Sequence, residues 1–131
     1  MLPQIQNFFQ MSEIALTIRA LRQEMLATNI ANSETANYKS KDIDFNETMK
    51  NIKNHKKKFD ALTTKSNKNF YKNIIPYLKI NTSSKNINKS NNNTVDMNQE
   101  RIKFAENAIQ YQILLSILNA QIKDMSTAIK G

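Results

Sequence analysis

Apolar residues recur at helical spacing in the C-terminal third of the chain. Between residues 104 and 129 they follow one another at alternating steps of four and three positions, without interruption. This spacing places them along one face of an α-helix, as in the heptad repeat of a coiled coil. We call this set the C-terminal seam: Phe104, Ala108, Tyr111, Leu115, Leu118, Ile122, Met125 and Ile129.

The same predicted helix carries a second apolar face, so it can contact more than one neighbour. That face consists of Ile102, Ile109, Ile113, Ile117 and Ala120. At the start of the helix, Asp96 followed by Gln99 is typical of an N-cap with its capping-box partner. The only glycine of the protein, Gly131, is expected to end the helix.

The N-terminal segment has a similar pattern and predicts a helix from about residue 4 to about residue 32. Pro3 is compatible with this helix because proline is tolerated in a first helical turn. A thinner second face of mostly small residues would let another backbone approach closely: Leu16, Ala20, Ala27 and Ala31. The main apolar set, which we call the N-terminal seam, is Met11, Ile14, Ile18, Leu21 and Met25.

The simplest arrangement of the two seams is an antiparallel hairpin within one molecule. Burial of one seam offsets only part of the entropy lost when a long helix is ordered, and the second faces would stay in water. We therefore expect the helices to become stable within a larger assembly. The predicted fold is mainly α, with long N- and C-terminal helices pairing in a coiled-coil-like manner and an extended or partly disordered central segment.

The middle of the chain, residues 50–94, shows no sustained helical or strand period. Residues 50–59 and 81–94 are typical of solvated, low-complexity linkers. Residues 70–80 have enough aromatic and β-branched side chains for a short strand or hairpin, which Pro76 would restrict to a sheet edge. The chain accordingly divides into four segments: a helix over 1–34, a turn and extension over 35–49, a variable basic linker over 50–94 and a helix over 95–131.

The charge of the protein is concentrated in this middle segment. The chain has a net charge of +8, while residues 50–94 hold eleven lysines against one acidic residue. One interpretation is a cytoplasmic basic coiled-coil protein that binds nucleic acid through residues 50–94, with Lys56, Lys57 and Lys58 as its best cluster. The other interpretation is that the lysine excess reflects AT-rich coding in the genome, since AT-rich codons favour Lys, Asn and Ile. We favour the second, because the cluster lacks arginine and an aromatic platform.

The sequence contains no convincing catalytic, cofactor-binding or metal site, and we expect no enzymatic activity. His55 lies in a lysine run without a partner that would orient it. Asp42, Asp44 and Glu47 have a spacing seen in cation sites but lack a glycine turn and further ligands. No cysteine is present, no apolar run is long enough to span a membrane, and the N-terminus does not have the pattern of a cleavable secretory signal.

Two motifs at the ends of the chain resemble a known family, the bacterial flagellar axial proteins, which include rod, hook and hook-associated subunits. LATNIANSETANYKSKDIDF (26–45) resembles their A-N-N-I-A-N-A-x-T-x-G-Y-K signature. TVDMNQERIKFAENAIQYQ (94–112) resembles one rod subunit of this family in its V-D-M, F-A-E-N and Y-Q elements. The V-D-M and F-A-E-N elements argue against the alternative that the chain is one of the sister rod subunits. The resemblance covers about residues 1–49 and 93–131.

The resemblance implies a structural subunit of the proximal rod of the flagellar basal body. Such a subunit polymerises through its terminal helices around the export channel, with other copies of itself and sister rod and basal-body proteins as partners. It would be exported without a cleavable signal peptide to the periplasmic rod, through contact with the flagellar export gate. No nucleic-acid partner and no membrane span are then expected.

The resemblance also singles out the turn after the first helix and a possible export motif. The turn residues are Asn29, Asn32, Asn37 and Tyr38. Amide side chains can satisfy backbone groups where the helix ends, and Asn37, which replaces the usual turn glycine, tolerates positive φ. Phe45 and Met49 resemble the F-x-x-x-hydrophobic motif read by the export gate. The alternative interpretation is an apolar pair that pins a loop.

Overall fold

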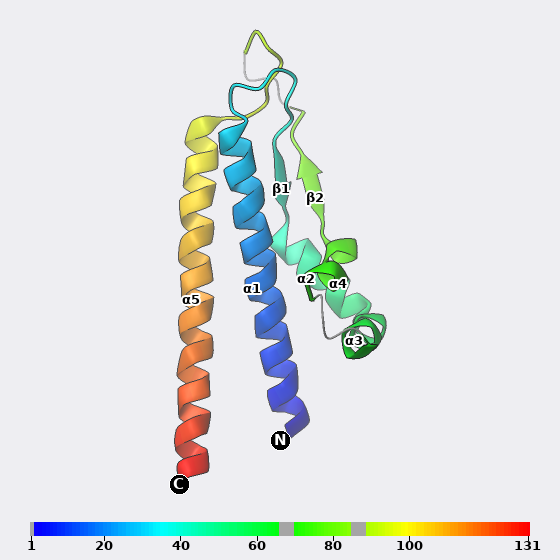
Figure 1. The fold of residues 1–131 in the computed structure, drawn as a ribbon, viewed down its shortest axis with the longest axis vertical. Coiled ribbons are helices and arrows are strands. Elements are labelled where there is room, and N and C mark those ends of the chain that lie inside the picture. The colour runs from blue at the N-terminus through cyan, green and yellow to red at the C-terminus, as the bar shows by residue number, and fades with distance from the viewer. Residues whose placement is uncertain (1, 66–69, 85–88) are drawn as a thin grey trace.

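The computed structural model describes residues 2–65, 70–84 and 89–131 (Figure 1). Two long helices dominate it: α1, Leu2–Ala31, and α5, Met97–Lys130. They lie side by side and run in opposite directions, so the two chain ends lie at the same end of the molecule (Figure 1). The prediction of a mainly α fold with long paired terminal helices is therefore confirmed.

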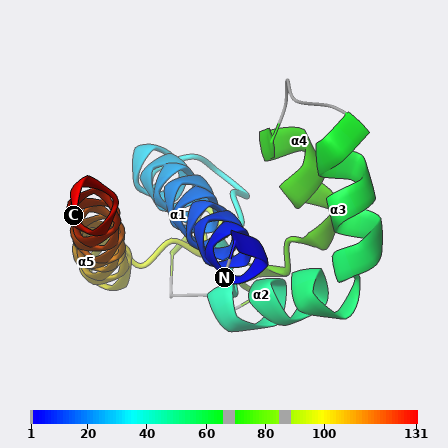
Figure 2. The same cartoon turned by 90° about the horizontal axis from the view of Figure 1, so that it is seen from below.

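The central segment folds into short elements on the other side of α1 (Figure 2). Along the chain these are β1 (Lys41–Ile43), α2 (Phe45–Asn54), α3 (Lys56–Lys65), α4 (Phe70–Ile74), a 3-10 turn (Ile75–Tyr77) and β2 (Ile80–Thr82). β1 and β2 pair antiparallel, with Lys41 opposite Thr82 and Ile43 opposite Ile80. α1 thus lies between α5 and the central elements, whereas α5 has α1 on one side only (Figure 2).

The ends of the long helices lie close to where the sequence predicts them. α1 spans residues 2–31 against the expected 4–32. The Asp96 carboxylate accepts hydrogen bonds from the backbone N–H groups of Asn98 and Gln99, which confirms it as the N-cap of α5. Gly131 follows the last helical residue with φ of +69°, a conformation open to glycine.

The core of the molecule lies between α1 and the central elements. Its buried members are Ile14, Ile18, Ile43, Ile52, Phe59 and Ile74. The rest of the N-terminal seam, Met11, Leu21 and Met25, packs against this cluster. The N-terminal seam therefore faces the central segment, and not α5 as in the simple two-seam hairpin.

The expectation that residues 50–59 form a solvated linker is wrong. They belong to α2 and α3, where Ile52 and Phe59 are each 1% exposed. Phe45, Met49 and Ile52 follow one another at steps of four and three on α2, and Phe59 lies on α3, after the helix break at His55. A segment boundary at residue 50 separates Phe45 and Met49 from Ile52 and Phe59. The lysines between these apolar residues lie on the outer faces of the helices. This is why the helical period was missed.

Two further expectations for the central segment need correction. Residues 70–77 form helical turns, and a strand begins only at Ile80, where its partner is the distant β1 and not a local hairpin strand. Within the predicted linker 81–94, Asn93 and Thr94 are buried at 0% and 2% exposure. Residues 85–88 of that linker lie outside the described residues.

Candidate assembly site

The turn after α1 is organised by the side-chain amide of Asn29, which is 0% exposed. Its Nδ2 donates to the Lys41 carbonyl oxygen at 2.6 Å and to Glu100 Oε2 at 2.9 Å. Its Oδ1 accepts from the Lys41 backbone N–H at 3.1 Å and from the Tyr38 hydroxyl at 2.9 Å. Both donors and both lone pairs are used, so one side chain joins α1, the start of β1 and α5.

Tyr38 and Glu100 complete this connection. Glu100, in the first turn of α5, is 3% exposed and has Lys103 Nζ at 3.5 Å as a counter-charge. Burial and, to a lesser extent, the Glu100 carboxylate raise the pKa of the Tyr38 phenol. The hydroxyl therefore remains protonated well above neutral pH and keeps its role as a donor to Asn29.

A second buried amide, Asn93, ties the segment before α5 to the end of α1. Its Nδ2 donates to the carbonyl oxygens of Asn32 and Thr35, both at 2.8 Å. Its Oδ1 accepts from the Val95 backbone N–H at 2.8 Å. Two carbonyls of the turn after α1 thus gain a second donor from a residue far along the chain. The sequence interpretation missed Asn93, although it directly precedes the T-V-D-M element.

The other turn residues behave as the sequence predicts. Asn32 Nδ2 donates to the Thr28 carbonyl oxygen at 2.8 Å, so an amide side chain does satisfy a backbone group at the helix end. Asn37 has φ of +60°, the positive φ that the sequence predicts this asparagine to tolerate. Its backbone N–H donates to the Asn91 carbonyl oxygen at 2.8 Å. Asn92 shares the positive φ, at +57°, and was not foreseen.

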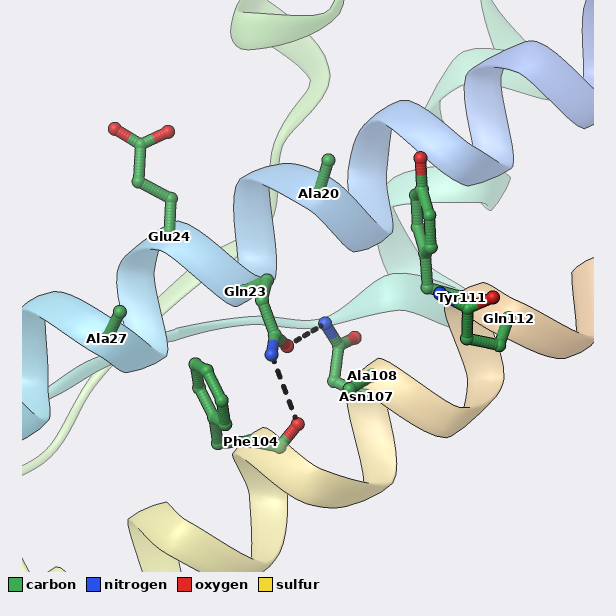
Figure 3. A pocket seen from close by; sticks show the side chains of 9 residues that line it. All are labelled: Ala20, Gln23, Glu24, Ala27, Phe104, Asn107, Ala108, Tyr111 and Gln112. Carbon is green, nitrogen blue, oxygen red and sulfur yellow. Dashed lines mark hydrogen bonds between the residues drawn. The ribbon is translucent and has the colours of Figure 1, made fainter. Parts of the chain in front are cut away.

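A third buried amide, Asn107, lies between the two long helices (Figure 3). Its Nδ2 donates to the Arg19 carbonyl oxygen at 2.8 Å and to Gln23 Oε1 at 2.7 Å. Gln23 Nε2 in turn donates to the Phe104 carbonyl oxygen at 3.3 Å. A buried, paired amide of this kind fixes the register of two helices. The sequence interpretation missed Asn107 because it counted only apolar positions along α5.

Beside these amides a groove of about 480 Å³ runs along the joint between α1 and α5. Small residues of the predicted second face of α1, Ala20 and Ala27, line one side of it (Figure 3). Phe104, Ala108 and Tyr111 of the C-terminal seam line the other. The small face of α1 does lie next to another helix, as the sequence predicts.

The C-terminal seam is only partly covered within one molecule. Phe104, Ala108, Tyr111, Leu115, Leu118 and Met125 are half-buried. Ile122 and Ile129 remain 47% and 82% exposed. The second face of α5 is exposed throughout, at Ile102, Ile109, Ile113 and Ile117. From Asn107 to Ile122, α5 carries no charged residue on any face. A helix that is largely apolar on several sides is typical of one that other helices surround.

Phe45 and Met49 lie on one face of α2 and pack against the core. They belong to α2 and not to a loop. The Arg19 guanidinium carbon lies 3.9 Å from the centroid of the Phe45 ring, in cation–π geometry. Burial and the nearby Arg22 charge lower the pKa of Arg19, and the ring offsets part of the cost of burying this cation.

Of the remaining candidate groups, Asp42, Asp44 and Lys56 have structural partners. Asp42 forms a two-point ion pair with Arg22, at 2.7 and 3.0 Å, and Asp44 caps α2 by accepting from the Glu47 backbone N–H at 3.0 Å. Across the described part of the chain, no group of three or more potential ligands is placed to hold a metal ion. Lys56 Nζ lies 3.1 Å from Asp60 Oδ2.

His55 ends α2, and the centroid of its ring lies 5.9 Å from that of Tyr77. Among the described helices, none has both the length and the hydropathy needed to cross a membrane.

Comparison with known proteins identifies the family. No protein-family model matches the chain. Over 136 residues it is 35% identical to the flagellar basal body rod protein FlgB of Escherichia coli (strain K12), covering 100% of this chain and 99% of that protein. It is 37% identical to FlgB of Buchnera aphidicola subsp. Acyrthosiphon pisum over 134 residues, covering 100% of both. FlgB of Salmonella typhimurium is 33% identical, with 100% of this chain and 99% of the relative covered.

These alignments span the middle of the chain as well as the two terminal motifs that resemble flagellar axial proteins. Full-length similarity at this level confirms that resemblance. The chain belongs to the FlgB family of flagellar basal body rod proteins.

Proposed function

We propose that this protein is a subunit of the proximal rod that polymerises through α1 and α5 around the flagellar export channel. Its partners are other copies of itself and sister rod and basal-body proteins. The monomer supplies a core between α1 and the central elements, and α5 supplies the surface through which subunits associate.

The observation that carries this proposal is the apolar outer face of α5. Ile109, Ile113 and Ile117 are 60%, 53% and 48% exposed, on the side turned away from the half-buried seam. Exposed isoleucines in an uncharged stretch of a long helix are costly in water and favourable in a subunit interface. The exposed apolar face supports a role in assembly. The buried polar side chains at the turn bind one another and the backbone, which supports a structural role for them as well.

We further propose that the chain reaches the rod unfolded, through the export gate. Phe45 and Met49 are packed on the folded core, so the gate can read them only before α2 docks on α1. The export gate therefore cannot bind Phe45 and Met49 in a chain that has already folded. This order suits a subunit that folds where it assembles.

Concentration-dependent association tests the proposal. Sedimentation velocity of the purified protein should show assembly as concentration rises, while the double variant Ile109→Asp/Ile113→Asp stays monomeric. Both substituted side chains are exposed, so circular dichroism should show unchanged helix content. Gln121→Asp, an exposed change elsewhere on α5, is the matched control and should assemble. A wild type that remains monomeric at every concentration, or a double variant that associates normally, would contradict the proposal.

A further inference from the structure

The surface of the α1–α5 pair carries two apolar features that do not coincide. One is the groove lined by Ala20, Ala27, Phe104 and Tyr111. The other is a row of exposed isoleucines, Ile102, Ile109, Ile113 and Ile117, which we call the α5 ridge. The ridge lies on the face of α5 directed away from α1, and the groove lies where the two helices meet.

The two features suit each other in shape and in charge. Alanines on α1 leave room in the groove for large side chains, and β-branched isoleucines project from the ridge. The ridge from Ile109 to Ile117 lies in the uncharged stretch of α5, and the groove has one charged residue at its lining, Glu24. An occupant with a charged face would leave ions unpaired against apolar side chains, so an uncharged helix face is the favoured partner.

The two features are also adjacent. Ala108 and Gln112 line both the groove and the hollow beside the ridge that contains Ile109, Ile113 and Ile117. The other residues of the two linings differ, so a molecule whose groove is occupied still has its own ridge free to enter the groove of the next molecule. Contacts between two different patches of the same chain are head-to-tail, and they propagate into rings or helical filaments rather than closing as a dimer.

We infer that the α5 ridge of one copy packs into the α1–α5 groove of the next copy. This rests on the proposed polymerisation and specifies which two surfaces meet. It distinguishes head-to-tail packing from a symmetric contact in which two ridges face each other. It also assigns a further role to the small residues Ala20 and Ala27, which leave the groove open for a large side chain.

Cysteine cross-linking tests the pairing directly, because the chain contains no cysteine of its own. Ile113→Cys places a thiol on the ridge, and Ala20→Cys or Ala27→Cys places one in the groove. Two single-cysteine proteins that differ in mass through a tag are mixed above the association concentration and oxidised mildly. A disulfide requires Cα atoms within about 7 Å, so the product reports close approach. Lys53→Cys, exposed on α2, replaces the groove cysteine in the control mixture.

We expect the ridge–groove heterodimer to exceed both homodimers and the Lys53→Cys control several-fold. The same product should form in isolated basal bodies of cells that express both variants. Predominance of Ile113→Cys homodimers would show ridge-to-ridge packing and overturn the inference while leaving polymerisation intact. Cross-linking of the groove cysteine mainly to a protein of another mass would assign the groove to a sister rod protein, again overturning it.

Failure of the proposed function gives a different result. In that case the mixture stays monomeric by sedimentation and no cross-link exceeds the control. Cross-links at the level of the control in a mixture that does sediment as assemblies would contradict the ridge–groove contact alone. The two measurements together separate the inference from the function on which it rests.

Discussion

The N- and C-terminal seams look alike in the sequence and differ in the folded molecule. Both repeat apolar residues at steps of three and four. In the N-terminal seam, Ile14 and Ile18 are 1% and 0% exposed and belong to the core with the central elements. In the C-terminal seam no residue is fully buried, and its last member, Ile129, is almost entirely exposed.

The different burial of the two seams shows that heptad spacing predicts an apolar helix face but does not predict which element packs against that face. α1 has neighbours on two sides and its seam is used within the molecule (Figure 2). Among the described elements, α5 packs mainly against α1 and holds more apolar surface than α1 covers. Substitutions in the first seam should therefore damage folding, and substitutions in the second should damage assembly.

The largest effect is expected for Leu118→Asp, in the middle of the C-terminal seam. A carboxylate at this half-buried position cannot be paired inside a packed helix interface, at a cost of several kcal/mol. Under the proposed export of an unfolded chain, secretion should not sense the change. We expect Leu118→Asp to be secreted by export-competent cells but absent from basal bodies, as measured by immunoblotting of secreted and basal-body fractions.

Asn92→Asp is the control for that experiment and should be both secreted and incorporated. Asn92 is exposed with φ of +57°, a conformation that aspartate also tolerates. Normal basal bodies built with Leu118→Asp would show that the C-terminal seam is not a packing surface.

The next effect compares isoleucines inside and outside the monomer. Ile18→Ala should lower the free energy of unfolding by about 2–5 kcal/mol, because it opens a cavity in the core. Ile109→Ala removes the same atoms from an exposed site and should change it by less than about 0.5 kcal/mol. Urea denaturation of both variants below the association concentration measures the difference. Equal losses would mean that the ridge is already covered in the monomer.

A smaller loss is expected where an amide joins the two long helices. Asn107→Ala leaves the Gln23 side chain and the Arg19 carbonyl without their buried donor, at a cost of about 1–3 kcal/mol in unfolding free energy. Asn119→Ala, at an exposed position of the same helix, is the matched control. If urea denaturation gave the same midpoint for both variants, the Asn107 contact would not determine how α5 docks on α1.

The smallest predicted effect is a change in pH dependence at the turn. The pKa of Tyr38 is raised in the folded state, so its contribution to stability is fully present below the unfolded value of about 10. It is lost as the pH rises from there through the folded pKa. The Tyr38→Phe variant should lose less unfolding free energy than wild type over that alkaline range. Tyr71→Phe, at an exposed tyrosine, should follow wild type, and parallel curves for all three would contradict the role of burial at Tyr38.

Much of the local structure could be predicted from the sequence alone. The two long helices, the Asp96 cap, the terminal glycine and the positive φ of Asn37 all depend on neighbours within a few residues, and local spacing and residue type were sufficient to predict them. The helices over residues 45–54 and 56–65 were not predicted, because a segment boundary at residue 50 separated the apolar residues of α2 from one another.

The tertiary structure decided which surfaces these helices present and which polar groups become partners. Asn29 meets Glu100, and Asn107 meets Arg19 and Gln23, across most of the length of the chain. No sequence period relates such positions, since the pairings arise only when α5 returns beside α1. Likewise, the central elements covered the N-terminal seam and left α5 half open, because a helix face is buried by whatever the chain path brings against it. Periodicity determined that each helix has an apolar face, and the chain path determined which face remained free for another molecule.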